Sequence, residues 1–486
     1  MAKTATSVVE QAPARAAPAL PLCVDLDGTL IATDVFVEST LAVVARHPLW
    51  VPRLALLFLH GRSRAKSFVS EHGELDVEAL PYREDVLEFL REERAKGRTL
   101  VLATAAHRLL AQKVAAHLGL FDDVLASSGS TNLKGTHKAE ALAQRFGEKG
   151  FSYAGDARVD QAVWARAGEA VVVGSAALAR RAARTTPVAK TFAPEPPGLK
   201  AAVRALRVHQ WLKNLLVFLP AFAAHRLRDP ATLVAALIAF WAFSLCASAV
   251  YVANDLADLS SDRRHRSKRT RPFASGAVPI AAGLGAIPLL LLSSAVLATL
   301  LPPSFGLVLA SYFVLTTLYT FSLKRIALVD VLALAGLYAV RIFAGGAAAE
   351  VAVSPWLIAF ALFLFLSLAL VKRVSELQAA TNGGASLSGR GYQPGDLEVL
   401  RQMGIASGYL AVLVLALYLQ SAKVEGLYRR PELLWLACPL LLFWVSRAWL
   451  VTHRGEMHDD PVVFALRDPL SLAVGVLTVL IVVLAT

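Results

Sequence analysis

Residues 254–272 combine acidic and basic side chains directly after an apolar run, in the order N-D-L-A-D-L-S-S-D-R-R-H-R-S-K-R-T-R-P. Asn254, Asp258 and Asp262 are spaced four residues apart, which places them on one stripe of a helix continuing from that run, while Asp255 is rotated off the stripe. Oxygen ligands on one face repel each other unless they share a cation, and oxygen-only sets favour Mg²⁺ with substrate phosphates. The stretch predicts a magnesium–diphosphate site; the alternative is a solvated helix end that pairs with its own basic tail.

Other polar residues stand at the ends of apolar runs or inside them, where a charge is costly and usually faces a cavity. We expect these residues to line an anion-binding mouth: Lys213, Asn214, Tyr319, Lys324, Arg325, Asp330, Arg341, Lys372, Arg373, Arg390 and Tyr392. The basic members would bind phosphate groups collectively. The alternatives are anchoring at the cytoplasmic surface, for the cations at run ends, and a structural pair between Arg341 and Asp330.

Carboxylates also follow a short apolar strand near the N-terminus, in L-C-V-D-L-D-G-T-L at 22–30. Short apolar runs such as T-L-V-L-A-T and V-V-V-G alternate with polar helical stretches up to residue 175, which is typical of an α/β domain with a parallel sheet. A helical insertion is expected between Asp34 and about residue 80. It would be a cap over the site, leaning on the bilayer, or else a structural helix pair. Its apolar face carries Trp50, Leu54, Leu57 and Phe58.

The chain has 486 residues, of which 56% are hydrophobic and 18% charged, and its formal net charge is +12. Such an apolar chain of this length is typical of a membrane protein with more than one domain. The positive charge favours membrane anchoring and anionic ligands over nucleic acid as a partner. Cys23, Cys246 and Cys438 have no paired spacing, so they predict neither a disulfide framework nor a thiolate metal site.

The composition changes near residue 200 and divides the chain into a disordered tail (1–20), an α/β domain (21–175), a linker (176–200) and an all-α membrane domain (201–486). Nine apolar runs are candidate spans: 209–225, 231–252, 282–300, 305–322, 327–345, 354–371, 403–420, 432–450 and 468–486. No signal peptide is recognisable, so a cytoplasmic N-terminus is expected. Basic residues then concentrate in the cytoplasmic loops, which predicts a multi-pass protein of the inner or plasma membrane with the α/β domain and the polar clusters on the cytoplasmic side.

The motif N-D-x-x-D-x-x-x-D after the second of the nine runs resembles the UbiA-type intramembrane prenyltransferases. The resemblance implies that Asn254, Asp255, Asp258 and Asp262 bind one Mg²⁺ and the diphosphate of a donor, with the last two acting in catalysis. Aromatic prenyltransferases of this family carry a second D-x-x-x-D motif after the fourth span. Here S-L-K-R-I-A-L-V-D-V offers only Asp330, which argues against an isoprenyl diphosphate donor.

One branch, the decaprenyl-phosphate phosphoribosyltransferases, is similar in several longer stretches. These are H-Q-W-L-K-N (209–214), the stretch 254–272, Y-T-F-S-L-K-R-I-A-L-V-D-V-L-A-L-A-G-L-Y-A-V-R (319–341) and D-P-V-V-F-A-L-R-D (460–468). The resemblance implies a polyprenyl phosphate acceptor and 5-phosphoribosyl 1-diphosphate as donor. Because both substrates are anionic, a site with more cations and fewer carboxylates suits them.

The N-terminal stretch resembles the haloacid dehalogenase-like hydrolases through four motifs in order: D-x-D-G-T, Thr104, Lys138 and G-D-A-R-V-D (155–160). The resemblance implies that Asp25 is the nucleophile and that Asp27 is the general acid and base. Asp25, Asp27, Asp156 and Asp160 would form the acidic set around a second Mg²⁺. Thr104 and Lys138 would bind the phosphoryl oxygens, with Lys134 as the alternative to Lys138.

Together the two resemblances predict a bifunctional membrane enzyme. The membrane domain would transfer 5-phosphoribose to a polyprenyl phosphate, and the hydrolase domain would remove the 5-phosphate to give polyprenyl-phosphoryl ribose, a precursor type for cell-envelope pentoses such as those of arabinan. Two alternatives stay open: an aromatic prenyltransferase, and a non-catalytic scaffold that binds lipid phosphate. The expected partners are the bilayer, the polyprenyl phosphate and the phosphoribosyl donor, and the sequence allows a homo-oligomer.

Overall fold

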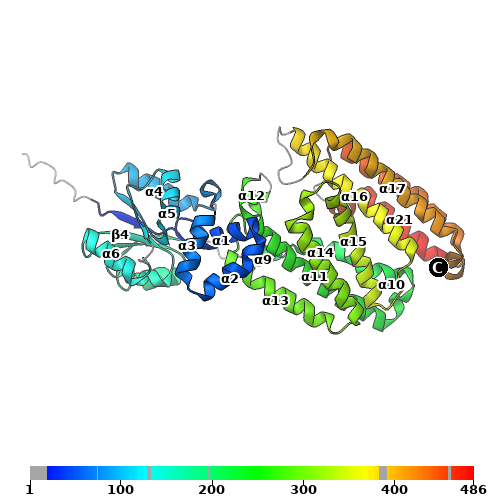
Figure 1. Cartoon of the computed structure of the whole chain (residues 1–486), viewed down its shortest axis with the longest axis horizontal. Helices are drawn as coiled ribbons and strands as arrows, with labels where there is room; N and C mark the ends of the chain where they lie inside the picture. The colour runs from blue at the N-terminus through cyan, green and yellow to red at the C-terminus, as the bar shows by residue number, and fades with distance from the viewer. Residues whose placement is uncertain are drawn as a thin grey trace, which may run out of the picture. The chain divides into compact units, whose positions relative to one another are not determined.

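The computed structural model describes residues 19–73, 75–128, 133–193, 198–265, 268–382, 391–457 and 461–486 (Figure 1). Residues 1–18 of the expected disordered tail lie outside the described part. The chain divides into two compact units, one formed by Met1–Ala201 with Ala257–Ile280 and the other by Ala202–Leu256 with Ala281–Thr486. We call them the hydrolase unit, after the family that its motifs resemble, and the membrane unit.

The hydrolase unit contains a six-stranded sheet in the order β3-β2-β1-β4-β5-β6, and every neighbouring pair is parallel. The strands are β1 Leu22–Val24, β2 Leu100–His107, β3 Asp123–Ser127, β4 Ser152–Gly155, β5 Glu169–Val173 and β6 Val188–Phe192. The parallel α/β architecture expected from the alternating apolar runs is confirmed. The strand order reverses at β1, between β2 and β4, and a reversal of this kind opens a crevice at the carboxyl ends of the strands.

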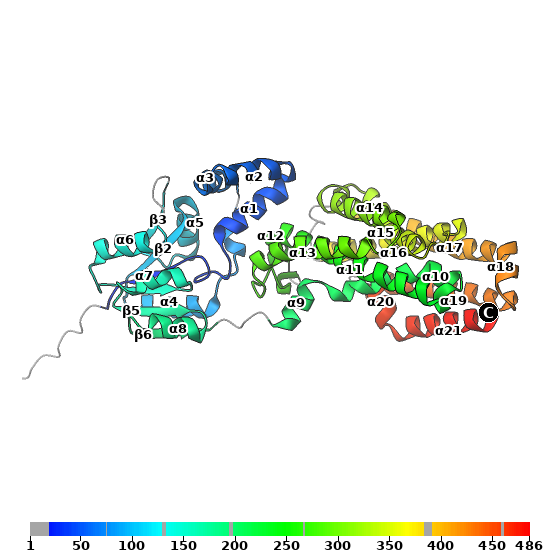
Figure 2. The same cartoon turned by 90° about the horizontal axis from the view of Figure 1, so that it is seen from below.

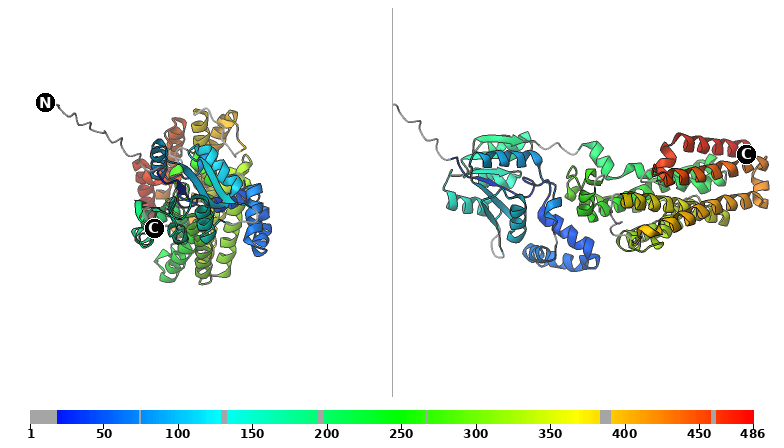
Figure 3. Two further views of the ribbon diagram at one scale, coloured as in Figure 1. Left: turned by 90° about the vertical axis from the view of Figure 1, so that its left-hand side faces the viewer. Right: turned by 90° about the horizontal axis from the view of Figure 1, so that it is seen from above.

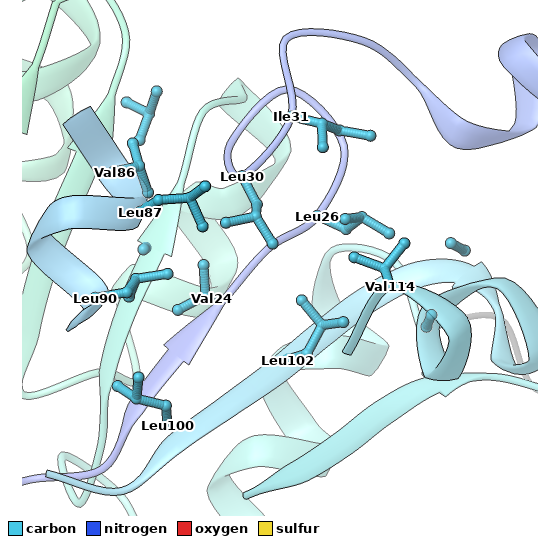
Figure 4. Packing of buried hydrophobic residues seen from close by; sticks show 14 of the residues in the cluster. Val24, Leu26, Leu30, Ile31, Val86, Leu87, Leu90, Leu100, Leu102 and Val114 are labelled. Carbon is cyan, nitrogen blue, oxygen red and sulfur yellow. The ribbon is translucent and has the colours of Figure 1, made fainter. Parts of the chain in front are cut away.

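Alternate residues of the central strands face two separate cores, as the pleat of a strand requires. Leu22 and Val24 belong to the core that α4 (Glu84–Ala95) and α5 (Arg108–Leu118) cover, and Figure 4 shows Val24 within it. Cys23 points the other way, into the core that α6 (Thr136–Phe146), α7 (Gln161–Trp164) and α8 (Ala176–Ala182) complete. Because both faces are buried, the strands are continuously apolar.

Residues 176–193 differ from the expected linker, because they form α8 and β6. The run A-A-L-A-R-R-A consists of good helix formers, and Ser175 caps it by accepting from the Leu178 amide. Val188–Phe192 then pairs with β5 through backbone hydrogen bonds. An edge strand can carry the polar residues that make this segment resemble a linker.

The helical insertion is confirmed and comprises α1 (Val35–Arg46), the 3₁₀ turn Pro48–Trp50, α2 (Val51–Leu59) and α3 (Arg62–His72), drawn in blue in Figure 2. Asp34 starts it, because its Oδ1 accepts from the Phe36 and Val37 amides at 2.8 and 3.1 Å. The insertion has a small core of its own, made by Val43, Leu54 and Val69 with Phe36, Val44, Trp50 and Phe68.

The membrane unit is helical, and seven of its described helices are long and apolar enough to span a bilayer. They are α11 Pro230–Ala257, α13 Ile280–Ala298, α14 Pro303–Phe321, α15 Val329–Ala348, α16 Pro355–Asn382, α17 Leu397–Leu419 and α19 Ala437–His453. α16 and α17 lie side by side along their lengths, in yellow and orange in Figure 3. The chain is a multi-pass membrane protein.

The expected count of nine spans is not confirmed, because the first and last apolar runs form shorter helices. The first becomes a 3₁₀ segment, η4 (Val208–Phe218), followed by α10 (Leu219–Ala223). The last is α21 (Pro469–Ala485), with 17 residues. About 20 α-helical residues are needed to cross the hydrocarbon core, and in the first run the polar Lys213 and Asn214 and the proline Pro220 interrupt an apolar α-helix.

Candidate functional sites

The four hydrolase motifs meet at the carboxyl ends of three adjacent strands. Asp25 directly follows β1, Thr104 lies in β2, and Asp156 directly follows β4. Val24 of β1 is in register with Leu102 of β2 and with Ala154 of β4, so the side chains that follow these positions share one edge of the sheet. Residues that are far apart in the sequence are therefore brought together by the strand order.

Lys138 reaches the site from α6. Its Nζ lies 2.9 Å from Asp25 Oδ2, and it also donates to the Tyr153 hydroxyl at 2.9 Å. Tyr153 in turn donates to Asp160 Oδ1 at 3.2 Å. Lys138 is buried, whereas Lys134 is exposed on the preceding loop, so the geometry favours Lys138 as the cation of the centre. Tyr153 is a member of this network that sequence reasoning missed, although it stands two residues before the G-D motif.

Three carboxylates form a cluster that suits a divalent cation. Oxygen atoms of Asp25, Asp156 and Asp160 lie within 4.8 Å of one another. Burial raises the pKa of Asp156 to about 7 and that of Asp160 to about 6, and repulsion from neighbouring carboxylates adds to both. Since burial and mutual repulsion disfavour the charged forms, a cation among them would relieve both effects. An oxygen-only donor set of this kind fits Mg²⁺.

Asp27 belongs to the same loop but is held differently. Its Oδ1 accepts from the Val35 amide at 2.8 Å, which joins it to the start of α1. Burial, followed by the negative charges of Asp34 and Asp25, raises the pKa of Asp27 to about 8. At neutral pH the carboxyl group is therefore largely protonated, which is the state that a general acid needs. The expected metal-binding set thus has three members in the cluster and Asp27 outside it.

The D-G-T segment has a steric reason for its glycine. Gly28 has φ +76°, and a Cβ there would lie 2.1 Å from Asp156 Oδ2, so a side chain would displace a carboxylate of the cluster. The next residue, Thr29, donates to Asp156 Oδ1 at 3.1 Å. Thr104 is buried within β2, where its Oγ1 accepts from the Ala106 amide at 3.0 Å, next to the point at which the pairing of β2 with β3 shifts register.

In the acidic stretch after α11, the helix is interrupted at one of the expected ligands. α11 ends at Ala257, Asp258 has φ −96° and ψ 10°, and the helix resumes as α12 (Leu259–Arg264). Asn254 is therefore on α11 and Asp262 on α12. The expected single continuous helix is thus interrupted at Asp258.

Two carboxylates of this stretch are paired with arginines. Asp255 is buried and accepts from Arg207, whose Nε lies 3.0 Å from Oδ2 and whose Nη2 bonds to Oδ1. Asp262 is buried and pairs with Arg271 Nη1 at 2.5 Å. Arg207 was not among the expected residues, although it lies two positions before the H-Q-W-L-K-N stretch. Of the two, the pair between Arg207 and Asp255 has two parallel bonds, an arrangement that is among the strongest ion pairs in proteins.

A second network surrounds Arg341, which is buried on α15. Its Nε donates to Asn214 Oδ1 at 2.9 Å, and Asn214 Nδ2 donates to Ser244 Oγ at 3.0 Å.

Aromatic rings surround the same arginine. The Arg341 guanidinium lies over the rings of Phe243, Tyr312 and Tyr338, at 5.2 to 5.5 Å. Lys213 Nζ is 5.7 Å from the centre of the Tyr338 ring, so the 3₁₀ segment and α15 bring both cations to one aromatic wall.

A glycine makes this close approach of η4 to α15 possible. A Cβ on Gly345 would lie 1.9 Å from the Val217 carbonyl oxygen, which is closer than any real contact. Gly345 stands one helical turn after Arg341, and Val217 stands three residues after Asn214. The bond between Asn214 and Arg341 therefore depends on the missing side chain at Gly345.

Asp330 pairs with Arg373, a partner that the alternative of a structural pair between Asp330 and Arg341 does not include. Arg373 Nη2 lies 2.6 Å from Asp330 Oδ2, and both side chains are fully buried. Arg373 also pairs with Glu376, and the Tyr392 hydroxyl donates to Asp330. α15 and α16 lie against each other, which brings Asp330 and Arg373 into reach from different helices.

Three of the remaining expected residues lie at or just after the end of α14. Tyr319 is near the end of α14, and Lys324 and Arg325 form the following 3₁₀ turn, Leu323–Arg325. Lys372 is half-buried on α16, one residue before Arg373. Gly391 has no room for a side chain, because its Cβ would lie 2.9 Å from the Arg325 carbonyl oxygen. Arg390 lies outside the described residues.

The segment after the acidic stretch also contacts the helical insertion within the hydrolase unit. Arg263 forms a buried, two-bonded pair with Glu38 of α1, at 2.6 and 3.1 Å, and donates to the Ala274 carbonyl at 2.9 Å. Arg264 pairs with Asp76 at 2.6 Å but is mostly exposed. Sequence reasoning missed Glu38, because a helical glutamate carries no local signal of a distant partner.

Comparison with known proteins identifies both halves of the chain. Residues 215–468 match the UbiA prenyltransferase family, and residues 22–163 match haloacid dehalogenase-like hydrolases. The uncharacterized protein y4nM of Sinorhizobium fredii is 39% identical over 94% of this chain and 89% of its own length. The nodulation protein NoeC of Azorhizobium caulinodans is 36% identical over 55% of this chain and 87% of its own length.

The decaprenyl-phosphate phosphoribosyltransferase of Mycobacterium tuberculosis is 35% identical to this chain over 281 residues, which cover 56% of this chain and 91% of that enzyme. The resemblance expected from the acidic stretch and from the D-x-D-G-T motif is confirmed in both halves. The chain belongs to the UbiA prenyltransferase family and carries a haloacid dehalogenase-like hydrolase domain at its N-terminal end.

Proposed function

We propose that the membrane unit transfers 5-phosphoribose from 5-phosphoribosyl 1-diphosphate to a polyprenyl phosphate, and that the hydrolase unit removes the 5-phosphate from the product. The observation that carries the transfer is the 35% identity to a decaprenyl-phosphate phosphoribosyltransferase over 91% of that enzyme's length. The arrangement of Asp330 supports this donor over an isoprenyl diphosphate. Its pairing with Arg373 uses the carboxylate that would otherwise begin a second acidic motif.

In the proposed transfer, a phosphate oxygen of the lipid forms a bond to the anomeric carbon while the bond from that carbon to diphosphate breaks. The nucleophile is already ionised, so the step needs no general base. Asn254, Asp258 and Asp262 would hold a Mg²⁺ ion that neutralises the departing diphosphate. The cations of the unit, Lys213, Lys324, Arg325 and Lys372 among them, would orient the two anions, and orientation supplies much of the rate when the reactants are charged.

In the proposed hydrolysis, Asp25 attacks the 5-phosphate, and the ribose hydroxyl leaves with a proton from Asp27. Asp27, now ionised, then takes a proton from the water that hydrolyses the aspartyl phosphate. Lys138 lies 2.9 Å from Asp25, where it would also neutralise the transferring phosphoryl group. Both reactions would occur on the cytoplasmic side, and their union in one chain raises the effective concentration of the second site.

The test is an incubation of purified protein with Mg²⁺, a polyprenyl monophosphate and a donor labelled on the ribose. We expect label in a lipid that lacks the 5-phosphate. Asp258→Ala should remove lipid label, and Asp25→Asn should leave label in a lipid that keeps the 5-phosphate. Asp229→Asn, at the opposite end of α11, is the matched control and should retain both steps.

Two results would replace the proposal. Prenyl transfer from geranyl or farnesyl diphosphate to an aromatic acid, without ribose transfer, would make the chain an aromatic prenyltransferase. Normal release of the 5-phosphate by Asp25→Asn would separate the hydrolase unit from the product of the membrane unit.

A further inference from the structure

Helix α2 of the hydrolase unit exposes apolar side chains around most of its circumference. Leu49, just before the helix, is 91% exposed and Leu59, at its end, is 84% exposed. Val51, Leu56 and Phe58 are also exposed, while Leu54 packs into the small core of the insertion. A surface helix of a soluble domain buries its apolar stripe and shows a polar one. A contiguous exposed apolar surface of this kind marks an interaction site.

The charges around this surface have one sign. Between residues 39 and 70 the sequence has no Asp or Glu, and it has five Lys or Arg residues, namely Arg46, Arg53, Arg62, Arg64 and Lys66. The described members Arg46, Arg53 and Arg64 are exposed. Arg53 also lies over the rings of Trp50 and Phe68, at 5.8 and 4.9 Å, so one cation is held directly beside the apolar surface.

We propose that residues 49–59 bind the anionic surface of the bilayer that the same chain spans. Short helices with exposed apolar residues and flanking cations lie in the interface of membranes, with the apolar side chains below the headgroups and the cations among the anionic lipids. Two observations favour lipid over a protein partner: the uninterrupted positive charge, and the seven candidate spans that tether this surface to a membrane permanently.

The proposed contact has a consequence for the hydrolase centre, because the insertion begins at that centre. The Val35 amide at the start of α1 donates to Asp27 Oδ1 at 2.8 Å, and α1 packs against α3, which packs against α2. Lipid binding by α2 would thus hold the catalytic loop at the membrane surface, where a phosphate ester on a lipid is located. Binding itself does not depend on the proposed function; only the identity of this substrate does.

The test places an environment-sensitive fluorophore on Leu59→Cys in the full-length chain in lipid nanodiscs. Cys438→Ser removes the half-buried native thiol, while Cys23 and Cys246 are buried. We expect a blue-shifted emission and quenching by lipids spin-labelled near the headgroup, in discs with anionic lipid. The same label on Gln112→Cys, an exposed residue of α5, should show neither effect.

Several outcomes would overturn the proposal. Equal quenching at positions 59 and 112 would mean that the contact is not specific to α2. Absence of quenching at position 59 would exclude a lipid contact. Energy transfer between labelled copies, without quenching, would make a second copy of the chain the occupant. Quenching that is unchanged when anionic lipid is replaced by zwitterionic lipid would contradict the role of the cations.

A second variant tests the consequence without relying on the label. In the full-length chain reconstituted into anionic vesicles, Leu49→Ser, Leu56→Ser and Leu59→Ser together should slow hydrolysis of a phosphate monoester embedded in the same bilayer by about tenfold, since α2 no longer holds the catalytic loop at the membrane surface. Hydrolysis of soluble p-nitrophenyl phosphate should be unchanged, which also confirms that the unit is folded. Equal loss on both substrates, or no loss on either, would contradict the proposal. If wild type hydrolyses the soluble ester but no lipid ester, the proposed substrate fails while the fluorescence test still decides the lipid contact.

Discussion

Buried charges have different neighbours in the hydrolase centre and in the membrane unit. In the hydrolase centre, Asp25, Asp156 and Asp160 lie against one another, and Lys138 is the cation paired with Asp25. In the membrane unit, Asp255 and Asp330 are each paired with an arginine. The first arrangement brings like charges together, where a divalent cation would relieve their repulsion, whereas in the second each carboxylate is neutralised by its arginine. A cluster of like charges therefore indicates a candidate catalytic or metal-binding site. A matched ion pair indicates a contact that holds the surrounding helices in position.

The largest expected effect is the loss of phosphatase activity without a loss of transferase activity. Asp25→Asn removes the proposed nucleophile, so phosphatase activity on a soluble ester should fall by about 10³-fold or more. Transfer to the lipid should be unchanged. The measurement is a pair of rate assays on one preparation, with Glu84→Gln as an exposed control. Loss of both activities would contradict the independence of the two centres.

The next effect would break a neutral pair in the membrane unit. Arg373→Gln leaves the fully buried Asp330 without its cation, which should lower the free energy of unfolding by about 3–5 kcal/mol. Thermal unfolding in detergent would measure this change. Adding Asp330→Asn should recover part of the loss, because the uncompensated charge disappears. If Arg373→Gln alone were as stable as the wild type, water would have to reach Asp330 and Arg373.

A smaller loss of stability is expected when Gly345, which lets η4 approach α15 near Arg341, is given a side chain. Gly345→Ala places a Cβ against the Val217 carbonyl and should destabilise the unit by about 1–3 kcal/mol through overpacking, with a loss of transferase activity. Gly336→Ala, on the same helix, is the matched control. The heavy atom nearest to its Cβ would be Leu315 Cδ2, at 4.0 Å, so stability should be retained or slightly raised. Equal stability of the two variants would show that the close approach of η4 to α15 does not depend on a glycine at position 345.

The smallest expected effect concerns the contact between the acidic stretch and the insertion. Glu38→Gln removes the charge that holds Arg263, which should weaken the hydrolase unit by about 1–2 kcal/mol. Hydrogen exchange of the backbone amides in 257–265 should become faster. Asp76→Asn, whose partner Arg264 is mostly exposed, should change exchange less. The opposite order would mean that burial does not decide the strength of these two pairs.

The hydrolase half could be predicted further than the membrane half. Asp25, Lys138 and Asp156 each follow or face a strand end, and parallel strands bring such ends to one edge whatever the details of packing. Even so, Tyr153 was missed, because a buried tyrosine next to a motif resembles an ordinary core residue. Residues 176–193 form a helix and an edge strand where the sequence predicts a linker, because an edge strand with polar residues lacks a continuous apolar pattern.

The sequence by itself determined the two families, the parallel sheet, the long apolar helices and the residue types at both centres, because these follow from local spacing and composition. Tertiary structure decided the partners. Asp330 pairs with Arg373 and Arg341 with Asn214, because α16 supplies Arg373, η4 supplies Asn214, and both segments pack against α15. Spacing along one helix predicts which residues share a face, but helix packing decides which charge from another segment reaches them.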